Sequence, residues 1–128
     1  MKTHYVVALS LVGGAALGAG VVQGLHAQAK PPVFQITLQD VRDLDALNKE
    51  FVPQARAAVR QYGGHPLASG VPVSIEGAPP KGRVVINQWS SIEQLRQWYN
   101  SPEYQKAREI GNKYATFQIF AVEGIPQP

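Results

Sequence analysis

Hydrophobic and polar residues alternate strictly at the start of the region that follows an apolar leader. Between residues 33 and 39, Phe34, Ile36 and Leu38 fall on one side and Gln35, Thr37 and Gln39 on the other. A period of two residues places successive side chains on opposite faces of an extended chain. The pattern therefore predicts a half-buried β-strand over residues 33–39.

The period then lengthens to three and four residues, which predicts a helix that ends at Gly63 and Gly64. Asp43 is a suitable N-cap, because its carboxylate can accept a bond from a free backbone N–H of the first turn. Pro53 lacks a backbone donor and predicts a kink or two abutting pieces. The apolar positions of this helix are Leu44, Leu47, Phe51, Ala55, Ala58, Val59 and Tyr62.

Residues 65–82 are rich in proline and glycine. Val71–Ile75 predicts a short strand, and the nearby Pro66 and Pro72 predict that it is an irregular edge strand, because proline cannot donate to a ladder. Residues 77–82 predict a turn. The continuous apolar run that follows predicts a strand over Arg83–Trp89 that is covered on both faces.

Two further helices and a last strand complete the pattern. Ser90 and Ser91 cap the first helix, and Glu93 or Gln94 can reach back in a capping box. Ser101 caps the next helix, with Pro102 at its first position, where the missing donor costs nothing. Residues 116–124 then predict a strand that is apolar on both faces.

The order of these elements is β-α-β-β-α-β, which predicts an α+β, ferredoxin-like fold. Its four-stranded antiparallel sheet would carry the helices on one face. Both faces have apolar positions, because Val84 and Ile86 lie opposite Val85 and Phe120 lies opposite Ile119, and a second copy would cover the face that the helices leave open. A homodimer is therefore predicted, although the polar side of the first strand argues mildly against it.

The first 29 residues have the layout of a secretory signal peptide. Lys2 gives a basic start, an apolar run follows, and Ala27-Gln28-Ala29 provides a cleavage site after Ala29. The alternative is an uncleaved anchor, because the run is nearly long enough to cross a bilayer. Cleavage predicts a periplasmic or secreted single domain over residues 30–128, with no membrane attachment.

Composition excludes several classes of function. The net charge is +3 with the bases dispersed, which disfavours a nucleic-acid interface. The chain has no cysteine, and His65 is the one histidine left after cleavage, so metal and haem sites have few ligands. We expect no metal and no cofactor, and no motif of nucleophilic catalysis is present.

Four residues are candidates for binding a small organic ligand: His65, Arg83, Asn87 and Trp89. His65 could act as a base near neutral pH, although a lone loop histidine is more often simply solvated. Arg83 could hold a carboxylate with its forked donors, although a surface ion pair is its commoner role. The aromatic residues Trp98 and Tyr99 are better explained as core.

Several motifs together resemble one bacterial family. They are "YGGHPLASG", "GRVVINQWSSIEQLRQWYNSPEYQKA" and "FAVEG". In this combination the chain resembles the domain of unknown function 1330 (DUF1330) family over about residues 33–125. The resemblance implies a dimeric α/β barrel of two facing sheets and no settled activity. It leaves two hypotheses open: a binder of small organic molecules, with or without cofactor-independent chemistry, and a non-catalytic interaction dimer with a packed interior.

Overall fold

Four antiparallel strands form one open sheet in the computed structural model, which describes residues 30–128. The strands are β1 (Val33–Val41), β2 (His65–Gly70), β3 (Arg83–Trp89) and β4 (Ala115–Glu123), in the spatial order β2-β3-β1-β4. This is the predicted ferredoxin-like arrangement. The proposed signal peptide lies outside the described residues. Within the described part, no helix is long and apolar enough to span a membrane.

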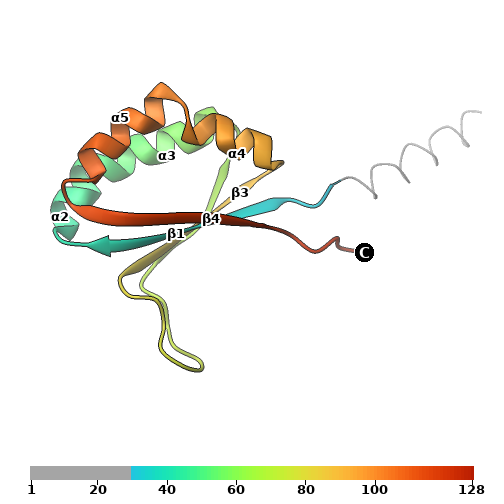
Figure 1. Ribbon diagram of the computed structural model, residues 1–128, viewed down its shortest axis with the longest axis horizontal. Helices are drawn as coiled ribbons and strands as arrows, with labels where there is room; N and C mark the ends of the chain where they lie inside the picture. Colours follow the sequence, from blue (N-terminus) through green and yellow to red (C-terminus); the bar gives the residue numbers. More distant parts are fainter. Residues whose placement is uncertain (1–29) are drawn as a thin grey trace, which may run out of the picture. The chain divides into compact units, whose positions relative to one another are not determined.

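All helices of the described region lie over the same face of the sheet (Figure 1). The first helical segment is divided into α2 (Leu44–Ala46), a π-helical turn (Leu47–Phe51) and α3 (Val52–Gln61). Asp43 caps α2 as predicted, accepting a bond from the Ala46 N–H at 3.1 Å. The wider turn falls directly before Pro53, where the α-helical ladder loses a donor.

The second helical segment is divided where the serine and proline predict. Ser91 accepts a bond from the Gln94 N–H and begins α4 (Ile92–Tyr99), while Gln94 reaches back to the Ser90 N–H. Ser101 accepts from the Tyr104 N–H and begins α5 (Pro102–Gly111). These caps turn the chain so that both helices stay on the sheet.

The polar side of β1 faces the helices, which reverses the expectation drawn from sequence. Gln35 pairs across from Asn87, and the side chains of both are buried. Thr37 and Gln39, on the same side, are 4% and 6% exposed. The argument that a polar outer face opposes dimerisation is therefore wrong, because that face is the inner one.

The outer face of the sheet, which we call the bare face, is apolar. Its register places Ile36 between Ile86 on β3 and Phe120 on β4. Phe120 and Val122 are 49% and 56% exposed. The apolar residues of the bare face are Phe34, Ile36, Leu38, Val84, Ile86, Phe120 and Val122.

The predicted strand at Val71–Ile75 is wrong. The edge strand β2 begins at His65, immediately after the glycines, and it pairs with β3 through a bulge between Pro66 and Ala68. Gly64 fixes this start, because an added Cβ would lie 2.7 Å from the Trp89 ring. Residues 71–82 instead form an arm that extends on the side of the sheet away from the helices (Figure 1).

Aromatic side chains from the sheet and the second helical segment form one end of the core. The Trp89 and Trp98 rings are 5.2 Å apart, and Trp98 stacks on Tyr104 at 4.1 Å. Trp98 is buried as predicted for a core residue, whereas Tyr99 is 38% exposed. Phe51 and Phe117, 5.2 Å apart, close the opposite end between the π-helical turn and β4.

Candidate functional site

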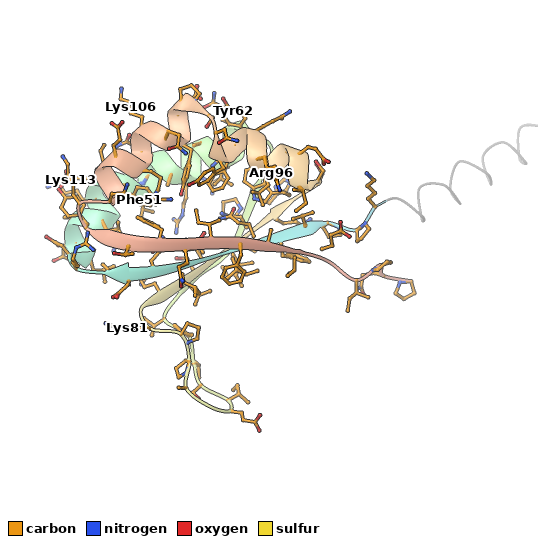
Figure 2. All side chains as sticks on the ribbon, in the orientation of Figure 1. Phe51, Tyr62, Lys81, Arg96, Lys106 and Lys113 are labelled. Atoms are coloured by element: carbon orange, nitrogen blue, oxygen red, sulfur yellow. The ribbon has the colours of Figure 1, made fainter. Side chains whose placement is uncertain are left out.

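A cavity of about 340 Å³ lies between α3 and the inner face of the sheet. Figure 2 shows Phe51 in the same layer, between the helices and the strands. Apolar side chains such as Phe51, Val59 and Phe117 form part of its wall. The cavity is partly open to solvent, because exposed residues such as Arg56, Arg60 and Ser69 also line it.

The sheet side of the cavity carries a polar row, which we define as Gln35, Thr37, Gln39 and Asn87. Gln35 is the centre of the row. Its Oε1 accepts bonds from Trp89 Nε1 at 2.9 Å and Asn87 Nδ2 at 3.1 Å, and its Nε2 donates to Thr37 Oγ1 at 2.7 Å. These bonds hold the amide of Gln35 in one orientation, because Trp89 can only donate.

Arginines occupy the rim of the cavity. Arg83 extends from β3, is half-buried, and donates from Nη2 to Ser69 Oγ at 3.3 Å. Arg56 and Arg60 project from α3 at positions four residues apart and are exposed. Side chains with this spacing lie on the same helix face. The two helical arginines and Arg83 therefore border one opening.

Trp98 and Tyr104 form the inner wall. Trp98 is 1% exposed, and its indole Nε1 has no hydrogen-bond partner within the described residues. Burial raises the pKa of the Tyr104 hydroxyl, and the nearby Arg108 guanidinium partly opposes this effect. Tyr104 therefore stays a neutral phenol at physiological pH, and Trp98 offers a free donor.

The structure brings three of the four predicted site residues together. Arg83 and Asn87 line the cavity, and Trp89 lies behind them as the donor that fixes Gln35. His65 is separate: it pairs with Gln88 in the register and lies on the opposite sheet face, exposed to solvent. His65 does not line this cavity, and a role for it stays a prediction.

The cavity lining contains arginines and a tyrosine but no carboxylate, imidazole, thiol or lysine among the described residues. No group of three or more potential metal ligands occurs anywhere in residues 30–128. A second, more apolar hollow lies between α4 and β4, where the Arg108 guanidinium stacks on Phe117 at 4.1 Å. The larger set of buried polar side chains marks the first cavity as the candidate site.

Sequence reasoning missed the β1 members of the polar row and the two helical arginines. The alternation in residues 33–39 did show that Gln35, Thr37 and Gln39 share one side, but it could not show which side faces the helices. Arg56 and Arg60 are four residues apart in the sequence, which was a visible signal of a shared helix face.

Solved structures with the same fold are similar to this chain at low identity. The RPA0582 protein of unknown function from Rhodopseudomonas palustris is 14% identical, with a TM-score of 0.56, over 81% of this chain and 92% of that one. SnoaB, a cofactor-independent oxygenase from Streptomyces nogalater, is 11% identical, with a TM-score of 0.58, over 76% and 96%. A dimeric ferredoxin-like protein of unknown function from Bacteroides fragilis is 15% identical, with a TM-score of 0.53, over 73% and 96%.

These similarities establish the fold alone, because function does not follow from fold at such identities. No curated protein matches the chain. The family model described as "Domain of unknown function (DUF1330)" matches residues 32–125, which is nearly all of the region that the structure describes. The motifs quoted above lie within this match, and the chain belongs to the DUF1330 family.

Proposed function

We propose that this chain is an exported, homodimeric protein that binds a small, partly apolar organic molecule in the cavity between α3 and the sheet. The polar row is the observation that carries the proposal. A packed interior favours apolar side chains, because buried polar groups lose water and need partners in the protein. Gln35, Thr37 and Asn87 have such partners in one another. Here four polar side chains border a space instead of filling it.

The size of the cavity favours a binder over a packed interaction dimer. Ligand sites commonly occupy about 300–1,000 Å³ and combine apolar walls with a few fixed polar groups. The cavity of about 340 Å³ has this composition, with Phe51 and Val59 on one side and Gln35 and Asn87 on the other. A ligand of this type would gain both apolar contact and defined hydrogen bonds.

Binding is better supported than acid–base catalysis. SnoaB is a cofactor-independent oxygenase with the same fold, which makes related chemistry worth testing in this chain. Among the lining residues, however, the Tyr104 hydroxyl is the group that could most readily act as a base, and burial raises its pKa. A proton acceptor for neutral pH would have to come from the ligand or from solvent.

The bare face supports the homodimer. Two copies that pack these faces together would bury Phe120 and Val122, which are about half exposed in one chain. The arm lies on the same side and exposes Val71, Val73 and Ile75 by 72%, 82% and 93%. An arm with these residues can reach over a partner on the bare face, and the similar protein from Bacteroides fragilis is dimeric.

Native mass spectrometry of the protein purified from the periplasm tests this proposal. We expect a dimer of residues 30–128 that carries an additional small mass, which denaturation releases. Ala55→Phe, which fills the cavity from α3, should remove that mass, whereas Ala57→Phe on the exposed side of the same helix should retain it. A protein without added mass from several hosts, which also binds no member of a library of small organic compounds, would contradict the proposal.

A further inference from the structure

The charges around the cavity are all of one sign. Arg56, Arg60 and Arg83 border it, and no aspartate or glutamate belongs to its lining. Among residues 30–128 the one ion pair between side chains joins Lys81 to Asp40, at the base of the arm. The three guanidinium groups therefore have no carboxylate partner in the part of the chain that the structure describes.

This arrangement of charge is unfavourable without a ligand. Like charges four residues apart on a helix destabilise it, and Arg56 and Arg60 have this spacing. Arg83 uses one terminal nitrogen on the neutral Ser69 hydroxyl, which leaves the other donors of its planar fork available. An anion at this rim would satisfy the donors and relieve the repulsion.

The indole of Trp98 is a second, independent observation. A buried donor without a partner costs free energy relative to a bonded one. The Trp98 Nε1 is such a donor within the described residues, and its ring is part of the cavity wall. A ligand that packs against the Trp98 ring could supply the missing acceptor for this buried donor.

We infer that the ligand is an organic anion, with an apolar or aromatic body inside the cavity and an acidic group at the arginine rim. The inference rests on the proposed binding function and names the chemical class of its ligand. Arg83 holds the acidic group together with Ser69, while Arg56 and Arg60 attract it at the opening. An oxygen acceptor of the same molecule pairs with Trp98.

Two fluorescent probes that differ only in charge test this inference. Anilinonaphthalene sulfonate is an anion, and phenylnaphthylamine is the same aromatic framework without the sulfonate. On the mature protein we expect the anion to bind at least about tenfold more tightly, which corresponds to 1.4 kcal/mol. Arg83→Gln should weaken binding of the anionic probe about tenfold and change the Kd of the neutral probe less than about twofold. The neutral probe therefore also reports that the site is folded.

Control variants separate this inference from the proposed function. Lys106→Gln on α5 removes an equal charge from a side chain that points away from the sheet (Figure 2), and it should change neither probe. Suppose that both probes bind equally well, and that this binding is unaffected by Arg83→Gln but lost in Ala55→Phe. This result would overturn the inference that the ligand is an anion and leave the binding function intact. Binding that survives Ala55→Phe, or no binding of either probe, would overturn both.

Discussion

Replacement of Gln35 by methionine tests the inward orientation of the polar row. Methionine has a similar length but accepts no comparable hydrogen bond. The change removes the acceptor of Trp89 Nε1, at 2.9 Å, and of Asn87 Nδ2, at 3.1 Å. Trp89 is 1% exposed, so its donor loses a partner that water cannot replace, whereas Asn87 can turn toward the cavity.

The expected loss follows from that difference. One buried donor without a partner costs about 1–3 kcal/mol, and a weakened Asn87 bond adds about 0.5–1.5 kcal/mol. Better burial of the methionine offsets part of this sum, so we expect Gln35→Met to lower the free energy of unfolding by about 1–3 kcal/mol. In a domain of this length each kcal/mol lowers Tm by about 4–8 °C.

A double-mutant cycle separates this bond from general packing effects. Trp89→Phe removes the donor, so the double variant Gln35→Met, Trp89→Phe leaves no orphaned group at that position. We expect a coupling free energy of at least about 1 kcal/mol. Urea unfolding followed by far-ultraviolet circular dichroism measures it, at fixed protein concentration because a dimer's stability depends on concentration.

Gln97→Met is the matched control, because Gln97 is exposed on α4 and should change stability by less than about 0.5 kcal/mol. If Gln35→Met were as neutral as the control, and the coupling were zero, Gln35 would face solvent. The polar side of β1 would then be the outer one, and the cavity as described would not exist.

Three other predictions concern the bare face, the helix contact and the leader. Phe120→Asp places a charge on the bare face, and sedimentation should show a shift from dimer to monomer; an unchanged mass would contradict the dimer interface. The hydrogen bond that the Tyr62 hydroxyl donates lowers the pKa of Glu103. The stability that this bond contributes is therefore complete above the ordinary glutamate pKa, and it is lost as the pH falls through the lowered value. Tyr62→Phe should therefore flatten the loss of stability in acid measured by urea unfolding, and an unchanged pH profile would refute this role. If the leader is cut on export, N-terminal sequencing of protein from a periplasmic extract should begin at Lys30, whereas an intact leader in the membrane fraction would support an anchor.

Local chemistry made much of the fold predictable. Asp43, Ser91 and Ser101 each cap the helix that they were expected to cap, because a cap depends on a few neighbouring backbone groups. The strand Arg83–Trp89 was also predicted with its observed bounds. Its continuous apolar run predicted cover on both faces, and the structure places β3 between β2 and β1 with the helices over one face.

The errors come from interactions between distant residues. Val71–Ile75 has the composition of a strand, but strand formation depends on a partner, and β3 is already paired with His65–Gly70. The orientation of β1 depends on which side meets the helices, and alternation alone is symmetric in this respect. The same ambiguity affected the prediction of the candidate site: Arg83 and Asn87 were predicted from the sequence, whereas Gln35 on β1 was not.

The indole resonances of the two tryptophans test the central claim most directly. A nitrogen–proton correlation spectrum of the mature protein should contain two indole cross-peaks, and Trp89→Phe assigns them. During a titration with anilinonaphthalene sulfonate, we predict that the Trp98 cross-peak moves and saturates with the Kd seen by fluorescence, because the Trp98 ring belongs to the cavity wall. An unmoved Trp98 cross-peak at saturating probe would contradict a ligand cavity on the polar inner face of the sheet.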